Sequence, residues 1–368
     1  MIFLIGGFTI LHVFFYCFLA YRWRYIPKPE EKGSSISFSV VIPVRNEEKT
    51  ITNILECLEC QNYPKNLFEV IVVDDFSEDA TQEKVYQFAS NSDVNIRVSK
   101  LTDKTKKGKK HALTEGVKKA RFETIITTDA DCQMGEKWLK SYADAFTHNL
   151  NMVAGPVAIL GKNFFGRLQQ VEFAGLIGFG AVTLQEENPS MCSGANLGFK
   201  KKAFEAVGGY RNNLFIPSGD DEFLLFNIMK QFPHSTSFLK SEDAVVYTQA
   251  HSRLSSFVNQ RVRWTSKWKY NKNWKVRLSA ILFFFDYLFF YVALISGFLG
   301  TIDLRIIVSI IVLRYTSLSL FVSPVNRFLK GKSSVLPLMI FQIIYPLHVL
   351  FMGMNSIFGS YTWKGRKY

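Results

Sequence analysis

Hydrophobic residues follow two different patterns along this chain. Residues 1–21 form an uncharged run long enough to cross a bilayer with about 30 Å of hydrocarbon. Three further apolar runs cover about 279–300, 305–323 and 335–359. Between the two ends, residues 36–250 alternate short β-branched runs with stretches of helical spacing. The pattern predicts an α/β domain held between N-terminal and C-terminal membrane segments.

The middle of the chain predicts a mostly parallel sheet with helices on both faces. The expected elements follow one another as strand 37–44, helix 47–60, strand 68–75, helix 81–90, strand 95–100, helix 109–120 and strand 123–131. Continuous apolar strands that alternate with helices are typical of a sheet buried on both sides. In such sheets, ligands bind beyond the carboxyl ends of the strands.

Basic residues around the apolar runs predict the orientation in the membrane. Arg22, Arg24 and Lys28 follow the first run, and a basic segment before it is missing. This favours an uncleaved anchor over a secretory signal peptide, with the following residues in the cytoplasm. The chain has 44 Lys and Arg against 31 Asp and Glu, a balance that suits an anionic inner leaflet.

The three C-terminal runs do not all fit a simple span. Asp286 and Arg314 lie within the first and second runs, where a charge exposed to lipid is costly. The basic residues of 327–332 place that loop inside, so the basic tail at 360–368 would end outside if every run crossed. We therefore expect one of the three segments to be re-entrant or interfacial.

Acidic side chains stand at the expected carboxyl ends of the strands. Glu47 follows the first strand, Asp74 and Asp75 end the second, and Asp129 and Asp131 end the fourth. Two carboxylates one residue apart share a face of an extended strand, and such oxygen ligands suit Mg²⁺ or Mn²⁺. The alternative is an ordinary turn rich in aspartate. Fingerprints of P-loop ATPases and dinucleotide oxidoreductases are missing from the sequence.

Two further stretches combine charge with chemistry. The lysine-rich run KTKKGKK at 104–110 has three interpretations: a solvated loop, a segment that binds phosphate, or a patch that binds nucleic acid. The stretch QRVRW places Gln260, Arg263 and Trp264 on one face of a helix. Such side chains bind hydroxyls, phosphate and the flat face of a sugar. Its alternative is an amphipathic helix over 251–276 that lies on the membrane.

Seven segments between about 37 and 270 have a distinctive order and spacing. They are VVIPVRNEEKTI, VIVVDDFSEDAT, KKGKKHALTEG, TTDADCQM, SGANLGFKKKAFEAVGGY, SGDDEFLL and QRVRW. Together they resemble the family 2 inverting glycosyltransferases with a GT-A fold. More narrowly, the chain is similar to the membrane-embedded branch that includes cellulose, hyaluronan and glucosylceramide synthases. The resemblance implies a GT-A nucleotide-diphospho-sugar transferase domain with transmembrane helices at both ends.

The resemblance also implies roles for acidic residues. Asp74 and Asp75 match the acidic pair that binds the nucleoside. Asp129 and Asp131 match the D-x-D that holds Mg²⁺ or Mn²⁺ against the donor diphosphate. Asp221 matches the catalytic base.

Other implied contacts surround these acids. Asp220 precedes the base at a position where Glu is common in the family. Glu47 and Lys109 are expected near the nucleotide. Donor and acceptor contacts are expected from these residues: Ser193, Gly194, Asn196, Asp220, Gln260, Arg263 and Trp264.

Two of these segments have plain structural alternatives. Ser218 and Asp221 also match a capping box at a helix start. The apolar stretch 164–187 is a candidate surface-lying helix, which would serve as part of the core or as an acceptor groove.

The sequence thus predicts an integral-membrane enzyme that moves a sugar from a UDP-sugar to a lipid or lipid-linked acceptor. The expected cellular location of the catalytic domain is the cytoplasmic side of a bacterial inner membrane. The expected reaction is a single displacement that inverts the anomeric configuration. A processive polysaccharide synthase of the same family is the first alternative. A non-catalytic sugar-nucleotide-binding scaffold is the second, and nucleic acid is not an expected partner.

Overall fold

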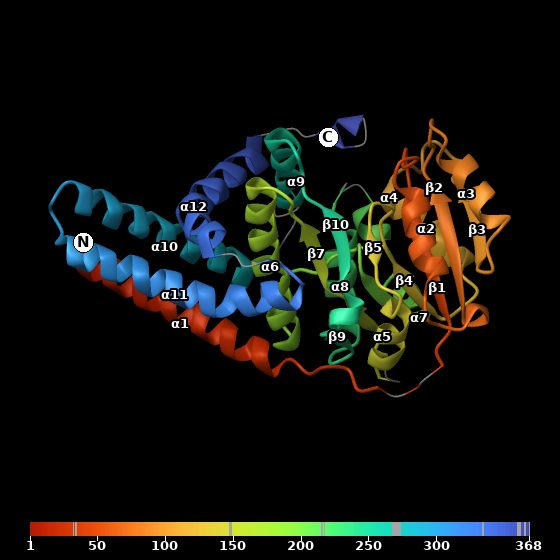
Figure 1. Cartoon of the computed structure of the whole chain (residues 1–368), viewed down its shortest axis with the longest axis horizontal. Coiled ribbons are helices and arrows are strands. Elements are labelled where there is room, and N and C mark those ends of the chain that lie inside the picture. Colours follow the sequence, from red (N-terminus) through yellow and green to blue (C-terminus); the bar gives the residue numbers. More distant parts are fainter. Residues whose placement is uncertain are drawn as a thin grey trace.

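The computed structural model describes residues 1–31, 33, 35–146, 149–214, 216, 218–266, 274–332, 335–358, 362–363 and 366–367. An α/β domain forms one end of the molecule, and a bundle of long helices extends from it (Figure 1). The expected basic tail and residues 267–273 of the expected interfacial helix lie largely outside the described residues. A short antiparallel pair, β11 (Thr362–Trp363) and β12 (Arg366–Lys367), is described near the end of the chain.

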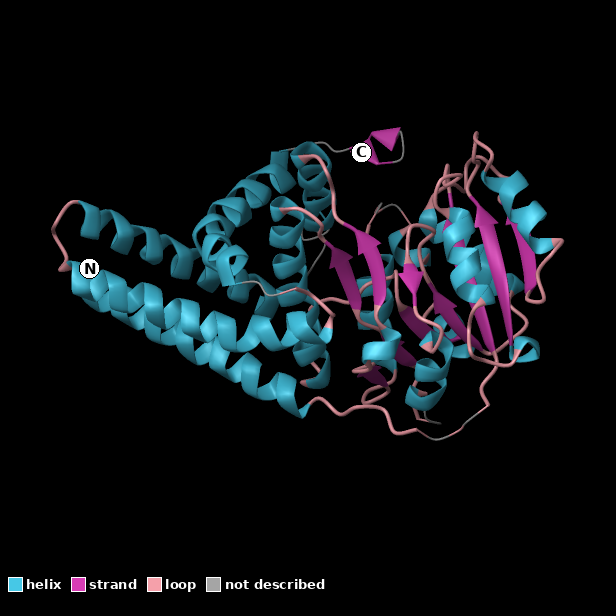
Figure 2. Ribbon diagram, viewed as in Figure 1, coloured by secondary structure: helices cyan, strands magenta, loops and turns pink. Residues whose placement is uncertain are grey.

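The α/β domain is built on a seven-stranded sheet with the order β3-β2-β1-β4-β8-β6-β9. Its strands are β1 (Phe38–Val44), β2 (Phe68–Asp74), β3 (Asn95–Lys100), β4 (Thr124–Thr127), β6 (Met152–Ala154), β8 (Leu197–Lys200) and β9 (Thr236–Phe238). β1 pairs in parallel with both β2 and β4, whereas β8 is antiparallel to β4 and β6. A second sheet joins β5 (Gln133–Met134), β10 (Val246–Gln249) and β7 (Val157–Leu160) (Figure 2).

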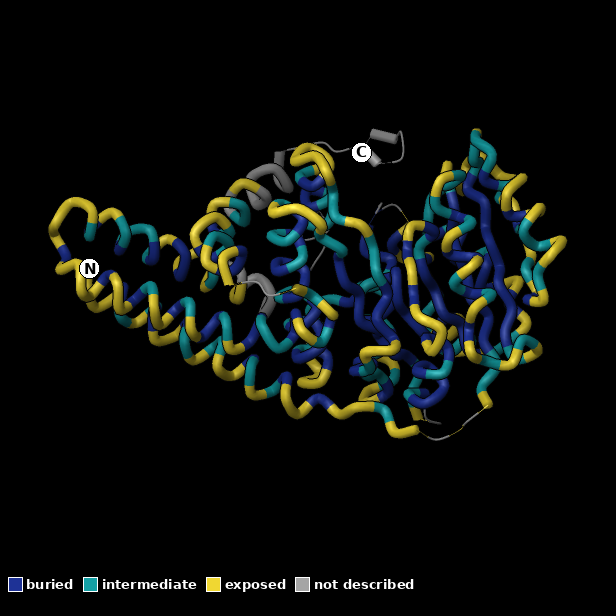
Figure 3. Tube along the Cα trace, in the orientation of Figure 1, coloured by how far each residue is buried: buried dark blue, intermediate teal, exposed yellow. Residues whose placement is uncertain are grey.

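Every residue of β1 and β2 is buried, as expected for strands covered on both faces (Figure 3). The helices of this domain are α2 (Ile51–Glu59), α3 (Thr81–Ala89), α4 (Lys109–Lys119), α5 (Trp138–Ala145), α7 (Lys201–Ala206) and α8 (Asp220–Gln231). The predicted mixed α/β class with a mostly parallel sheet is confirmed.

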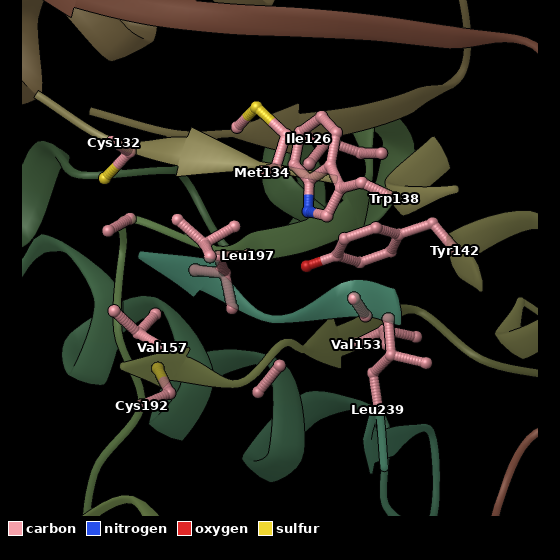
Figure 4. Packing of buried hydrophobic residues seen from close by; sticks show 14 of the residues in the cluster. Ile126, Cys132, Met134, Trp138, Tyr142, Val153, Val157, Cys192, Leu197 and Leu239 are labelled. Carbon is pink, nitrogen blue, oxygen red and sulfur yellow. The ribbon is translucent and has the colours of Figure 1, made fainter. Parts of the chain in front are cut away.

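The centre of the domain is a dense apolar core. Trp138 and Tyr142 of α5 meet edge to face, with ring centroids 5.6 Å apart, and both are fully buried. Leu197 of β8 and Val153 of β6 lie beside these rings (Figure 4). The aromatic pair thereby joins α5 to the antiparallel part of the sheet.

The helical part of the molecule contains the apolar runs. Its helices are α1 (Ile2–Tyr25), α6 (Phe164–Gln185), α9 (Leu254–Ser266), α10 (Trp274–Phe298), α11 (Leu304–Phe328) and α12 (Val335–Phe358). Among the described residues, α1, Ile281–Phe298 of α10, and α11 are long and apolar enough to cross a membrane. The stretch Val335–Val349 of α12 is shorter. The expected apolar helices at both ends of the chain are therefore present.

The helix α6 is buried, and it is not the surface-lying helix considered above. Val171, Phe173, Ala174 and Ile177 are at most 5% exposed. The helix contacts α11 and α12 as well as β7 of the second sheet. It therefore forms a core element that joins the α/β domain to the helical bundle.

The two charged residues of the C-terminal runs form a buried cluster. Arg314 donates from both terminal nitrogens to Asp286, over 2.7 and 2.9 Å. The Nδ1 atom of His12 lies 3.0 Å from the second oxygen of Asp286. This pairing joins α1, α10 and α11, and it buries both charges inside the helical bundle.

A second contact holds α1 against the α/β domain. Lys240 donates to the carbonyls of Trp23, Arg24 and Ile26 at the C-terminal end of α1. Its ammonium also lies 4.7 Å from the centre of the Trp23 ring. A helix end leaves its last carbonyls without partners, so Lys240 completes this end while it fixes the helix to the domain.

Replacement of Asp286 by Asn should destabilise the helical bundle. The change leaves the buried Arg314 without its counter-charge, which costs about 3 kcal/mol or more. We expect a clearly lower thermal unfolding temperature of the purified protein in detergent, measured by intrinsic fluorescence. Arg305→Met, at an exposed position of α11, is the matched control and should leave that temperature unchanged. Equal unfolding temperatures for the Asp286→Asn variant and the unaltered chain would contradict this account.

Candidate active site

The carboxyl ends of β1, β2 and β4 meet at one edge of the sheet. The parallel registers place Val44 beside Asp74, and Val41 beside Thr127. The loops that follow these strands therefore emerge together, as expected for a ligand crevice in a parallel sheet. The segment 192–196, before β8, reaches the same place, because Thr127 Oγ1 donates to the carbonyl of Gly194 over 3.0 Å.

Asp74 and Asp75 are both buried but have different neighbours. The carboxylate of Asp74 accepts from Ser77 N at 3.2 Å and from Gln82 Nε2 at 2.7 Å. It thus organises the turn after β2. Asp75 Oδ1 accepts from Gly108 N at 2.9 Å, which ties the end of β2 to the start of α4.

Glu47 lies in the loop between β1 and α2. Its carboxylate accepts from Thr50 Oγ1 at 2.7 Å, and its backbone N–H donates to Thr81 Oγ1 at 2.7 Å. The nearby Arg45 guanidinium donates to the carbonyl of Asp75 over 2.9 Å. The loops after β1 and β2 are consequently held together beside the crevice.

Lys109 connects two acidic segments that are far apart in sequence. Its Nζ atom lies 2.7 Å from Asp129 Oδ1 and 3.5 Å from Asp220 Oδ2. Burial alone would lower the pKa of Lys109, but the carboxylates of Asp129 and Asp220 outweigh burial, and the pKa is raised. This cation therefore stays charged and neutralises the site.

The charge of Asp220 responds to the same neighbours. Burial would raise the pKa of this carboxyl, but Lys109, Lys110 and Arg263 outweigh burial, so the pKa is lowered. Asp220 is therefore ionised at neutral pH. Arg263 of α9 belongs to the QRVRW segment. Its positive charge acts on the acidic doublet, which is formed by Asp220 and Asp221.

The aspartates of the D-x-D segment do not extend a strand. β4 ends at Thr127, and Cys132 N donates to the carbonyl of Asp129 at 3.1 Å, so the acids lie in a turn. The expectation that both side chains share one strand face is therefore wrong. The Asp129 side chain is 35% exposed because Lys109 covers part of it, whereas Asp131 is exposed.

Asp221 is held at the start of α8 by backbone donors. Its Oδ2 atom accepts from Gly194 N at 2.9 Å, and its Oδ1 atom accepts from Glu222 N at 2.8 Å. The N-cap of α8 is Gly219, with a φ of 76°, and no side chain caps the helix. The capping box of Ser218 and Asp221 is therefore not formed.

The backbone of Gly194 approaches the acids closely. A Cβ atom at this position would lie 3.1 Å from Asp220 Oδ2 and 3.5 Å from Lys109 Nζ. Ser193 is partly exposed next to it. The glycine thus allows its own N–H to reach Asp221 without crowding the Lys109 contacts.

Asn196 does not reach the crevice, contrary to the expectation of a donor or acceptor contact. It is fully buried, and its Oδ1 atom accepts from Trp138 Nε1 at 2.9 Å and Tyr142 OH at 2.8 Å. Its Nδ2 atom donates to the carbonyls of Pro156 and Ala244. Because the amide is satisfied by the protein, Asn196 supports the core beneath the site.

The QRVRW side chains divide between the site and the core. The ring of Trp264 contacts Phe173 of α6 and the guanidinium of Arg261, which lies 4.3 Å from its centre. Gln260 Oε1 accepts from Arg261. Trp264 therefore joins α9 to α6, and it is partly exposed, so its contact with a sugar stays a prediction. Arg263 remains partly exposed.

Two buried basic residues were not predicted from the sequence. Arg261 makes a buried two-point contact with Glu172 of α6, over 2.9 and 2.7 Å. Lys110 is buried among backbone carbonyls beside the acidic doublet. The spacing of Lys110 with Leu113 and Val117, which share the inner face of α4, is the pattern that would have shown its burial.

Comparison with known proteins agrees with this geometry. The sequence profile described as "Glycosyl transferase family 2" matches residues 39–208, and that described as "Glycosyl transferase family group 2" matches residues 124–359. The second match covers more than half of the chain. The chain is a family 2 glycosyltransferase. The enzyme class implied by the sequence motifs is thereby confirmed.

Individual relatives cover parts of this glycosyltransferase. Poly-β-1,6-N-acetyl-D-glucosamine synthase of Staphylococcus epidermidis is 29% identical over 201 residues, which are 51% of this chain and 44% of the relative. Glycosyltransferase AglE of Haloferax volcanii is 28% identical over 185 residues, which are 50% of this chain and 58% of the relative. The chain thus matches about half the length of these curated relatives.

A solved structure shows the same fold over nearly the whole glycosyltransferase. The mannosyltransferase PcManGT from Pyrobaculum calidifontis, in complex with GDP-Man and Mn²⁺, has a TM-score of 0.61. The match is 17% identical and covers 92% of this chain and 98% of that protein. The GT-A fold expected from the motifs is confirmed.

The structural assignment of Asn196 predicts a loss of stability on replacement by Ala. Trp138, Tyr142 and two carbonyls would lose their buried partner, at a cost of about 3 kcal/mol. Thermal unfolding should occur at a clearly lower temperature, while the KM for donor in the folded protein stays unchanged. Ser193→Ala, in the same segment, is the control for the unfolding temperature. A raised KM for donor without a loss of stability would contradict this structural role and indicate that Asn196 contacts the donor.

Proposed function

We propose that this glycosyltransferase is bound to the membrane and transfers a sugar, with inversion, from a UDP-sugar to a lipid or lipid-linked acceptor. The observation that carries the proposal is the contact of Lys109 with Asp129 and Asp220, beside Asp221. These residues come from three separate segments and converge where a nucleotide-sugar would bind in a parallel sheet. The same domain is fixed to an apolar helix through Lys240.

The proposed metal is Mg²⁺ or Mn²⁺ on Asp129 and Asp131. Both carboxylates lie in an open turn, and oxygen ligands suit these ions. Among the described residues, no group of three or more His, Cys, Asp or Glu is placed to hold a metal. This donor set suits an ion that is held by one or two carboxylates together with donor phosphates. Such an ion would stabilise charge on the departing diphosphate.

The residues of the chain divide the remaining work in this proposal. Asp75 is proposed to bind the nucleoside, Lys109 to neutralise the diphosphate side, and Asp221 to accept the proton of the acceptor hydroxyl. The two backbone N–H groups on Asp221 orient its carboxylate. As that oxygen attacks the anomeric carbon, the bond to the diphosphate breaks on the opposite face, and the configuration inverts.

Related proteins support a narrower donor class. N-acetylglucosamine appears in the names of two relatives. One is the poly-β-1,6-N-acetyl-D-glucosamine synthase of Staphylococcus epidermidis, and the other is the β-N-acetylglucosaminyltransferase TarS of Staphylococcus aureus. We therefore propose UDP-N-acetylglucosamine as the first donor to test. GDP-mannose, bound by the structural neighbour, is the comparison donor.

The acceptor is proposed to be a lipid because the catalytic domain is docked to the membrane helices. A processive polysaccharide synthase is the second candidate, and the name of the Staphylococcus epidermidis relative favours it. The proposed location is the cytoplasmic face of a bacterial plasma membrane. The family assignment favours an enzyme over a non-catalytic scaffold.

The position of α12 supports a three-span topology. α12 packs mainly on α9 and α6, and its His348 lies 3.6 Å from Glu172 of α6 (Figure 1). We propose that α12 lies at the membrane interface on the cytoplasmic side. The basic loop 327–332 and the tail 360–368 then share one side, which satisfies the positive-inside rule.

Replacement of Asp221 by Asn should abolish sugar transfer. Without the base, kcat should fall by about 100-fold or more. Membranes that contain the full chain are incubated with labelled UDP-N-acetylglucosamine, other UDP-sugars and GDP-mannose, and the extracted lipids and polymers are separated by size. The exposed Asp243→Asn serves as the control. Unchanged turnover in Asp221→Asn would reject the base, and a ladder of long polymer would favour the processive synthase.

The topology can be tested with fusions at the C-terminus. A green fluorescent protein fused after Tyr368 should fluoresce in bacterial cells, because the tail is proposed to be cytoplasmic. An alkaline phosphatase fused at the same place should be inactive for the same reason. Fusions of both reporters within 299–303, between α10 and α11, should give the reverse pattern. An active phosphatase at the C-terminus would instead make α12 a fourth span.

A further inference from the structure

Lys110 is a buried cation surrounded by backbone carbonyls. Lys110 is only 5% exposed, and its Nζ atom donates to the carbonyls of Asn213, Ile216 and Ser218 over 2.7, 2.8 and 3.2 Å. An ammonium has three N–H donors, and these three carbonyls match that number. The backbone carbonyls of these three residues are thus gathered around one point.

Neighbouring lysines of α4 act on different parts of the site. Successive residues of an α-helix point about 100° apart, so Lys109 and Lys110 face different directions. Lys109 meets the carboxylates of Asp129 and Asp220, whereas Lys110 meets the three backbone carbonyls named above. The start of α4 is itself fixed by the hydrogen bond from Gly108 N to Asp75.

A lysine at this position serves the loop more than the core. Lys110 shares the inner face of α4 with Leu113 and Val117, so an apolar side chain would also meet the packing requirement. Burial of a charge is costly unless hydrogen bonds replace its water. An apolar residue would avoid that cost but leave three carbonyls without this donor. The lysine therefore fixes where the carbonyls of Asn213, Ile216 and Ser218 lie.

The gathered segment leads directly into the acidic doublet. Ser218 is followed by Gly219, whose φ of 76° turns the chain into α8, and then by Asp220 and Asp221. The other end of the Asp221 contact is Gly194 N, which belongs to a different segment. A shift of 213–218 would therefore change the position of Asp221 relative to the rest of the crevice.

We propose that Lys110 is a positioning residue for sugar transfer: it holds the backbone of Asn213, Ile216 and Ser218 so that α8 presents Asp221 to the acceptor hydroxyl. The inference rests on the proposed role of Asp221 as the base. Lys110 itself touches neither donor nor acceptor in this scheme. It acts through the backbone that precedes the doublet.

The test replaces Lys110 by Met in the full chain and measures steady-state kinetics with the donor found in the panel above. A misplaced base should lower kcat by about 100-fold. The KM for donor should change by less than about threefold, because Asp75, Asp129 and Lys109 are untouched. Lys110→Arg keeps the charge and several donors, and it should recover about a tenth or more of the lost rate.

Lys118→Met is the matched control, since this lysine lies on the same helix α4 but is exposed. It should behave like the unaltered chain. Hydrogen exchange gives a measurement that does not depend on activity. The amides of Asn213, Ile216 and Ser218 should exchange faster in Lys110→Met than in Lys118→Met, because only the first change removes the donor that holds these residues.

The outcomes separate the two proposals. Full activity in Lys110→Met beside an inactive Asp221→Asn would overturn the role of Lys110 alone, whereas an active Asp221→Asn would overturn the base. Unchanged exchange of the Asn213, Ile216 and Ser218 amides would also overturn the role of Lys110, even without a known donor. If Lys110→Met does not yield a monodisperse protein, Lys110→Gln replaces it. Loss of the folded protein in both variants would assign Lys110 to stability and reject positioning.

Discussion

The site depends on the half-buried ammonium of Lys109, which lies between the carboxylates of Asp129 and Asp220. Asp129 and Asp220 belong to segments about ninety residues apart, and two carboxylates at one edge of a sheet repel each other in a poorly hydrated setting. The ammonium of Lys109 removes that repulsion and lets the turn after β4 approach the start of α8. The rest of the crevice, including the N–H of Gly194 on Asp221, is arranged around this contact.

Local sequence patterns were sufficient to predict the framework of the fold. The β-branched runs at 37–44 and 68–75 became β1 and β2 almost residue for residue, since continuous burial on both faces leaves little freedom in register. The run at 123–131 was less informative. Its polar end made the strand seem longer than β4, because the sequence pattern does not distinguish an extended aspartate from one in a turn.

Contacts between distant segments were not predictable in the same way. Asn196 is a polar residue in a segment rich in small residues, so its burial became evident only with Trp138 and Tyr142 beside it. The pairing of Asp286 with Arg314 likewise depends on how α10 and α11 meet. In both cases a polar side chain gains its role from a partner that lies far away in sequence.

The attachment of Lys240 to the end of α1 has a geometric consequence. Lys240 fixes the end of α1 to the α/β domain, so in the proposed membrane-bound enzyme the height of the crevice above the hydrocarbon would be set by the fold and not by a loose tether. For a substrate embedded in the bilayer, only a polar part of suitable length would bring its hydroxyl to that height. The attachment would then select acceptors by the length of their polar part, because the hydroxyl of a molecule with a shorter polar part would not reach the crevice.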